Sequence, residues 1–141
     1  MFLDASAVVA ILLRETEATG MLEIMEAARG NLRFSPITRL ESTLALVRAR
    51  VQSRGKGPAT AADFELAAAR VDELLEVLEA LEVEITPDMG RAAAMALSVY
   101  GKVVGHSAQL NMGDALSYAC AKASKLPLLY KGDDFRHTDL G

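Results

Sequence analysis

The chain has 141 residues, a length that suits one domain with a single hydrophobic core. Its apolar fraction of 51% and charged fraction of 24% are ordinary for a globular protein, and no low-complexity tract or long run of like charge indicates disorder. The formal net charge of -4 argues against broad, charge-driven binding to nucleic acid. This net charge does not exclude an enzyme that binds nucleic acid through a local basic patch and a metal ion.

The cysteine count and the first residues indicate the compartment. The single cysteine, Cys120, excludes an intrachain disulfide and suits a reducing environment. The apolar opening MFLDASAVVAILLRE has no basic segment before it and is interrupted by Asp4. It also falls short of the about 20 apolar residues of a membrane span. We therefore expect a cytoplasmic protein with no membrane association.

Short apolar segments alternate with amphipathic ones along the chain. We expect strands at residues 1–4, 32–36, 82–87 and 126–131, and a final short strand near Asp139. Helical periodicity, good helix formers and a cap at Ser6 predict helices at about 6–14, 16–29, 37–53, 60–81, 88–100 and 112–125. This alternation is typical of an α/β fold. We expect an α/β/α sandwich with a mostly parallel, roughly five-stranded sheet, in one domain over residues 1–141.

Several acids fall where the ligands of such a sheet bind, beyond the carboxyl ends of the strands. Asp4 ends the first strand, Glu41 lies one to two turns into the helix after the second, and Asp114 opens the helix before the fourth. Asp133 and Asp134 follow the fourth strand. Each acid alone also fits a structural role as a helix cap, a turn residue or a solvated residue. Together, however, the fold would bring these distant residues to one edge.

The chemistry of such a cluster is restricted. Three or four carboxylates in one place would repel each other and raise each other's pKa, and a hard divalent cation removes that repulsion. Oxygen-only ligands suit Mg²⁺ or Mn²⁺ and suit zinc poorly. Since Mg²⁺ commonly binds one or two carboxylates together with substrate phosphate oxygens, the expected reaction is hydrolysis of a phosphodiester.

Three segments, in this order, resemble those of a known family: FLDASAVVAILLRE, SPITRLESTLAL and LNMGDALSYACAKASKLPLLYKGDDFRHTDL. The chain resembles a PIN-domain ribonuclease, specifically the VapC toxins of prokaryotic toxin–antitoxin pairs, and the similarity spans essentially its whole length. The resemblance implies cleavage of RNA that depends on Mg²⁺ or Mn²⁺. It also implies a homodimer and a small cognate antitoxin that covers the active site.

Carried over by position, the resemblance places the acidic catalytic and metal site at Asp4, Glu41 and Asp114, with a fourth acid in GDDF. The family varies at the position of Asp133, so Asp134 is the preferred fourth acid, with Asp133 as the alternative. All the acids of the family site are therefore present.

Other residues are expected to support this site. Ser6 and Thr38 match small hydroxyl residues near the family site and are expected to orient carboxylates. Four cations near the acidic segments are candidates for contacts with RNA phosphates: Arg39, Arg48, Lys131 and Arg136. For the segment that contains Arg48, a solvated helix end is an equally good interpretation.

Two other classes of function fit the same acids. One is a different phosphate enzyme, such as a phosphatase or a DNA nuclease, built on a similar acidic edge. The other is a non-catalytic module of the same fold whose acids capture a basic partner peptide. A substrate panel separates the first alternative, and metal binding without any partner separates the second.

Overall fold

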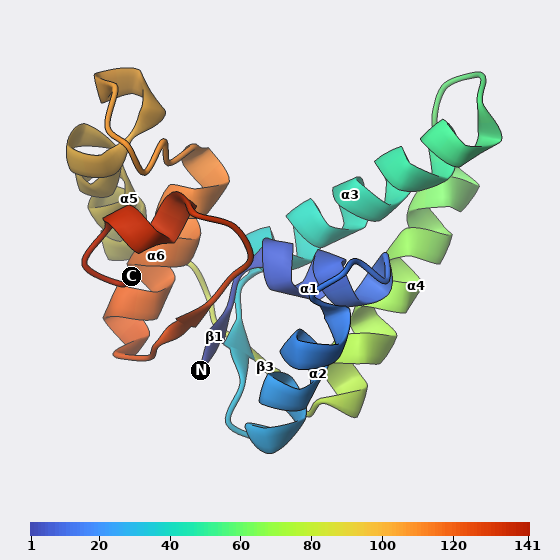
Figure 1. Cartoon of the computed structure of the whole chain (residues 1–141), viewed down its shortest axis with the longest axis horizontal. Helices are drawn as coiled ribbons and strands as arrows, with labels where there is room; N and C mark the ends of the chain where they lie inside the picture. The colour runs from blue at the N-terminus through green and yellow to red at the C-terminus, as the bar shows by residue number, and fades with distance from the viewer.

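Four short parallel strands form the centre of the fold, in the order β3-β2-β1-β4 (Figure 1). The computed structural model describes residues 1–141. The strands are β1 (Phe2–Leu3), β2 (Arg33–Phe34), β3 (Leu81–Glu82) and β4 (Leu128–Leu129). The six helices are α1 (Ala5–Leu12), α2 (Ala18–Ala27), α3 (Pro36–Arg54), α4 (Ala61–Val77), α5 (Pro87–Tyr100) and α6 (Met112–Ser124). Two 3₁₀ turns complete the chain, η1 (Lys102–Val104) and η2 (Asp134–His137).

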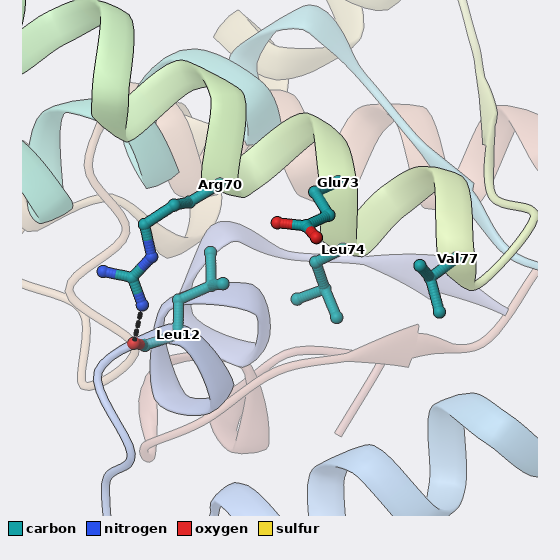
Figure 2. Close-up of a pocket in the computed structure, with 5 residues that line it drawn as sticks. All are labelled: Leu12, Arg70, Glu73, Leu74 and Val77. Carbon is teal, nitrogen blue, oxygen red and sulfur yellow. Dashed lines mark hydrogen bonds between the residues drawn. The ribbon is translucent and has the colours of Figure 1, made fainter.

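The end of α1 meets α4 at a shallow groove of about 310 Å³ (Figure 2). Arg70 of α4 donates a hydrogen bond of 2.8 Å to the carbonyl oxygen of Leu12, which joins the two helices. Leu74 and Val77 add apolar surface from α4. The groove therefore belongs to the packing of two helices and lies outside the sheet edge where the acids were expected.

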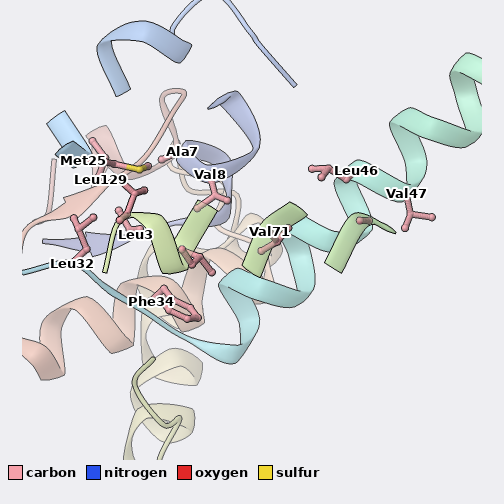
Figure 3. Packing of buried hydrophobic residues seen from close by; sticks show 13 residues of the cluster. Leu3, Ala7, Val8, Met25, Leu32, Phe34, Leu46, Val47, Val71 and Leu129 are labelled. Carbon is pink, nitrogen blue, oxygen red and sulfur yellow. The ribbon is translucent and has the colours of Figure 1, made fainter. Parts of the chain in front are cut away.

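The alternation of side chains along each strand divides the core into two parts. Leu3 and Leu129 face the cluster that α1, α2, α3 and α4 cover (Figure 3), whereas Phe2 and Leu128 face the cluster beneath α6 and η2. Figure 1 shows α5 and α6 on one side of the strands and α1 to α4 on the other. The expected α/β/α sandwich is confirmed.

Side-chain caps fix where the helices begin. Ser35 caps α3, because its Oγ accepts from the Thr38 amide at 3.4 Å while Thr38 Oγ1 accepts from the Ser35 amide at 3.3 Å. Pro36 follows in the first turn, where its missing N–H is not needed. At the other end, Gly55 adopts a φ of 83°, the left-handed conformation in which a side chain is disfavoured. These signals give α3 its full length.

Helices α3 and α4 form a hairpin that projects away from the sheet (Figure 1). Asp63, in the first turn of α4, is only 2% exposed and accepts hydrogen bonds from Arg50 Nε at 2.8 Å and Arg54 Nη2 at 2.9 Å. Its carboxylate also accepts from the Thr60 amide, which completes the cap of α4. Arg50 and Arg54, both on α3, therefore join the two helices of the hairpin through Asp63.

Two expectations about local structure are wrong. No fifth strand forms near Asp139, because Phe135 is buried in the core within η2 and the carboxylate of Asp139 is bound by Tyr118 and Lys122 of α6, both at 2.7 Å. Nor does Ser6 cap the first helix: Asp4 is the cap residue, and Ser6 lies inside α1. None of the helices combines the length and the apolar character that crossing a membrane requires.

Candidate active site at the carboxyl edge of the sheet

Four acids from distant segments interact at one edge of the sheet. Asp4 follows β1, Glu41 lies in the second turn of α3, Asp114 lies in the first turn of α6 and Asp134 begins η2 after β4. The charges of Asp4 and Asp114 raise the pKa of Glu41, and those of Asp4 and Asp134 raise the pKa of Asp114. The structure thus brings together the acids that the sequence placed at this edge.

Asp4 is buried, with 4% of its surface exposed. Its Oδ2 accepts hydrogen bonds from the Ser6 amide at 2.9 Å and from Ser6 Oγ at 2.6 Å. Ser6 Oγ in turn accepts from the amide of Lys131, just after β4, at 2.9 Å. Asp4 Oδ1 has no partner in the chain, although a buried carboxylate oxygen ordinarily requires one. Ser6 therefore orients Asp4, and Oδ1 is left for a group that the chain does not supply.

Glu41 has the most strongly perturbed carboxyl group at this edge. Burial is the largest cause, followed by the charges of Asp4 and Asp114, and together they raise the pKa of Glu41 to about 7 despite the opposing effect of Arg48. The Glu41 carboxylate lies against the backbone of α6 at Gly113, where any Cβ would collide with it. Gly113 therefore leaves space for the Glu41 carboxylate beside Asp114.

Asp114 is held in place by the start of its own helix. Its Oδ2 accepts from the Asn111 amide at 2.8 Å, and Asn111 Oδ1 accepts from the Asp114 amide at 3.1 Å. Burial raises the pKa of Asp114 to about 6; the hydrogen bond from Asn111 opposes the shift, and the charges of Asp4 and Asp134 add to it. Asp114 and Asn111 therefore cap α6 through two reciprocal hydrogen bonds, and the charge of Asp114 still acts on Glu41.

The two acids after β4 have different surroundings. Asp133 forms an ion pair of 2.9 Å with Arg136, three residues later. Asp134 raises the pKa of Asp114 by its charge. Arg136, which was expected to contact RNA, is thus ion-paired with Asp133. Asp134 affects the other acids of the site through its charge.

The remaining supporting residues divide by their partners. Thr38 Oγ1 donates to the carbonyl oxygen of Leu3 at 3.0 Å, so it joins α3 to the end of β1 and contacts no carboxylate. Arg39 lies over the Phe34 ring and its guanidinium is bound at 2.8 Å by each of two acids, Asp72 and Glu82. Thr38 and Arg39 therefore stabilise the packing of α3 against neighbouring segments.

Lys131 is also engaged within the chain. Its Nζ is 2.7 Å from Glu15 and 3.1 Å from Glu17, both in the connection between α1 and α2. Arg48, by contrast, is exposed, forms no ion pair and acts on Glu41 by its charge. Of the four cations expected to contact RNA, Arg48 alone is not already bound to an acid.

The donors at this edge fit a hard divalent cation. They are all carboxylate oxygens, and one of them, Asp4 Oδ1, is buried without a partner. No three His, Cys, Asp or Glu side chains of the chain converge closely enough to bind one ion together. A single cation at this edge would therefore bind at most two of these carboxylates directly.

Sequence reasoning missed two residues that shape the site, Asn111 and Gly113. The spacing N-x-x-D is a helix-cap signature and gave a signal for Asn111. For Gly113 no such signal exists, because the close approach of Glu41 depends on how α3 crosses α6. The groove between α1 and α4 contains none of the candidate acids.

Comparison with known proteins identifies the family of the chain. A family model for the PIN domain matches residues 1–140. The chain is 44% identical over 142 aligned positions to a VapC ribonuclease of Rhizobium meliloti (strain 1021), covering 99% of both chains. It is 34% identical over 140 positions to ribonuclease VapC42 of Mycobacterium tuberculosis (strain ATCC 25618 / H37Rv), covering 99% of this chain and 96% of that protein.

A solved structure shares the fold. The crystal structure of Mycobacterium tuberculosis VapC20, described as a Sarcin-Ricin loop cleaving toxin, superimposes with a TM-score of 0.67, covering 96% of this chain and 92% of that chain. At 14% sequence identity this match concerns the fold alone. The family match and the full-length relatives lead to one conclusion: the chain belongs to the PIN-domain family and, within it, to the VapC ribonucleases.

Proposed function

We propose that this chain is a metal-dependent endoribonuclease that hydrolyses RNA phosphodiester bonds as the toxin of a toxin–antitoxin pair. The observation that carries the proposal is the charge interaction among Asp4, Glu41 and Asp114, which come from three distant segments. Membership of the VapC ribonucleases supports RNA as the substrate. A ribonuclease acting on the cell's own RNA would work in the cytoplasm.

The acids at the edge of the sheet would hold Mg²⁺ or Mn²⁺. Asp4 and Asp114 are the proposed principal ligands, with Glu41 and Asp134 beside them and Asp133 as the alternative to Asp134. When bound, the cation polarises a phosphate oxygen and lowers the pKa of water. The free Oδ1 of Asp4 is the feature that best supports a cation here.

The other groups of the chain prepare this site. Ser6 and Asn111 fix the orientations of Asp4 and Asp114 by hydrogen bonds. Glu41, with a pKa of about 7, is suited to take up or release a proton at neutral pH. Arg48, exposed and free of ion pairs, provides positive charge for an incoming phosphate.

Cleavage of RNA with and without metal tests the proposal. Wild-type protein should cut RNA with Mg²⁺ or Mn²⁺ and lose activity in EDTA, and Asp4→Asn and Asp114→Asn should each lose activity. The matched control is Asp88→Asn: Asp88 also lies in the first turn of a helix, but its partner is Arg91 and it is exposed. Metal-stimulated cleavage that survives both active-site substitutions would refute the site assignment.

The same assay separates the alternative functions. Single-stranded DNA and a phosphomonoester, tested beside RNA, should remain uncut. Preference for either one would favour a different phosphate enzyme. No Mn²⁺ binding in calorimetry without a partner, together with no hydrolysis of any substrate, would favour a binding module.

We also propose that the protein is a homodimer. Five large apolar side chains on α5, η1 and the start of α6 are more than half exposed: Met95, Val99, Val103, Val104 and Met112. Exposed apolar side chains on neighbouring elements are typical of a protein interface. Light scattering should give twice the chain mass. Met95→Lys with Val103→Lys should give a monomer, whereas Val77→Lys, at an exposed position on α4, should not.

A small cognate antitoxin that covers the active site is the remaining partner in the proposal. It follows from membership of the VapC ribonucleases. Co-purification with the product of the neighbouring reading frame, and inhibition of RNA cleavage by that product, tests it. Unaltered cleavage at a stoichiometric excess of the product would contradict it.

A further inference from the structure

Three buried side-chain oxygens have no hydrogen-bond partner in the chain: Asp4 Oδ1, Ser42 Oγ and Ser117 Oγ. Both serines are completely buried. A polar group that folding removes from water without a replacement partner destabilises the fold, so such groups in a native protein require a cause. One of these atoms already belongs to the acidic site.

Other buried hydroxyls of the chain are satisfied, so the pattern is specific. Ser35 and Thr38 bond each other, and Thr38 also donates to the carbonyl oxygen of Leu3. Thr43 donates at 2.8 Å to the carbonyl oxygen of Arg39, one turn earlier in α3. A helical serine could satisfy itself in the same way, yet Ser42 and Ser117 do not.

Ser42 lies on α3 and Ser117 on α6, and these two helices contact each other. Ser42 follows Glu41, whose carboxylate lies against Gly113, and Ser117 is one turn beyond Gly113 on α6. One turn before Ser42, Thr38 binds the end of β1 at the residue that precedes Asp4. The three unpartnered oxygens therefore lie on α3, on α6 and just after β1, three segments that contact one another.

We propose that Ser42 and Ser117 are positioning residues that hold buried water beneath Asp4, and that this water donates to Asp4 Oδ1. A buried water needs two to four polar partners, and these three oxygens supply both donors and acceptors. A carboxylate oxygen with two lone pairs accepts from water and still faces a cation. Outer groups of this kind orient metal ligands, and their loss commonly weakens metal affinity about 10–100-fold. The inference rests on the proposed metal-dependent function.

The test compares threonine with valine at Ser117, since the two side chains have nearly the same volume and only threonine keeps a hydroxyl. Ser117→Val should bind Mn²⁺ at least about 10-fold more weakly than Ser117→Thr in calorimetry. Their melting temperatures without metal should be similar. Ser42→Val should likewise bind Mn²⁺ more weakly than Ser42→Thr. At Ser98, an exposed residue of α5 whose hydroxyl bonds the Met95 carbonyl, the pair should bind Mn²⁺ equally.

Equal Mn²⁺ affinities for the threonine and valine variants at both serines would overturn the inference. If the larger side chains prevent folding, Ser117→Ala and Ser42→Ala make the same comparison against wild type. A high-resolution crystal structure should show water within about 3.2 Å of Asp4 Oδ1 and of a serine hydroxyl, and a dry site would also overturn it. Asp4→Asn separates the two proposals: if it binds Mn²⁺ like wild type, the proposed metal site itself is wrong.

Discussion

The carboxylate of Glu41, on α3, lies against the backbone of Gly113, the residue of α6 that precedes Asp114. A Cβ on residue 113 would overlap the carboxylate, and Glu41, at the end of a flexible side chain, would have to move. The helix itself needs no change, because alanine favours a helix more than glycine does.

Gly113→Ala should therefore lower RNA cleavage without unfolding the protein. We expect at least a 10-fold loss of kcat/KM, equivalent to about 1.4 kcal/mol in the transition state, with an unchanged or higher melting temperature. Gly90→Ala is the matched control, because Gly90 lies in the first turns of α5 and a Cβ there meets no atom within 4 Å. Wild-type cleavage by Gly113→Ala would show that the position of Glu41 is unimportant.

Substitution of Glu41 should change how stability depends on pH. Since burial and neighbouring acids raise the pKa of Glu41 to about 7, its ionised form is less favourable in the fold than in the unfolded chain. The metal-free protein should lose stability as pH rises from about 4.3, the ordinary pKa of glutamate, to about 7. Glu41→Gln removes this loss.

Thermal unfolding in EDTA from pH 5 to pH 8 measures the effect. Glu41→Gln should melt above wild type at pH 8, and the difference should shrink towards pH 5. Glu23→Gln serves as the control, because Glu23 is an exposed residue of α2. A constant difference between Glu41→Gln and wild type across this range would contradict the role of burial and charge at Glu41.

Much of the candidate site could be predicted because two of its acids, Asp4 and Asp114, lie directly after a strand and at the start of a helix. Asp4 directly follows an apolar strand, and Asp114 opens a helix whose N-x-x-D spacing is local in sequence. Such signals do not depend on how distant helices cross. The strand order and the approach of Gly113 to Glu41 do depend on it, and no single segment contains that information.

The differences between the expectations and the structure arise for the same reason: they depend on how distant segments pack. A fifth strand was expected near Asp139, but the segment is fixed by side chains of α6, Tyr118 and Lys122, which are distant in sequence. Arg39 and Lys131 were expected to contact RNA because they adjoin the acids in sequence. Their actual partners, such as Asp72 and Glu15, lie on other elements that fold beside them.

Arg48 and Arg39 should separate substrate binding from stability. Arg48 is exposed and unpaired, so Arg48→Ala should raise KM for RNA and reduce the salt dependence of binding by about one unit of slope, with the melting temperature nearly unchanged. Arg39→Ala loses two ion pairs and the contact with Phe34, so it should cost about 1 kcal/mol of stability while KM stays the same.

Kinetics at two or more salt concentrations, together with thermal unfolding, check both substitutions. An Arg39→Ala protein that binds RNA as weakly as Arg48→Ala would mean that the ion pairs of Arg39 open for substrate. The two arginines would then share one role in binding.

Asp63 should make the α3–α4 hairpin sensitive to acid. Hydrogen bonds from Arg54, the Thr60 amide, Arg50 and the Thr60 hydroxyl hold the pKa of Asp63 well below its usual range. A carboxyl group with a lowered pKa in the fold stabilises the protein above its unfolded value of about 3.9, and this contribution disappears as pH falls further. Asp63→Asn keeps the shape of the cap but removes the charge that the two arginines face.

Asp63→Asn should therefore melt several degrees below wild type at pH 7, and the difference between the two melting temperatures should become smaller as pH falls from about 4 to 2.5. Protein freed of metal before the measurement removes any contribution from metal binding, and the raised pKa values of Glu41 and Asp114 affect both proteins equally because the acidic site is unchanged. Asp88→Asn, in an exposed pair with Arg91, should differ little from wild type at either pH. Parallel melting curves for Asp63→Asn and wild type down to pH 2.5 would show that the arginines hold the hairpin without the charge of Asp63.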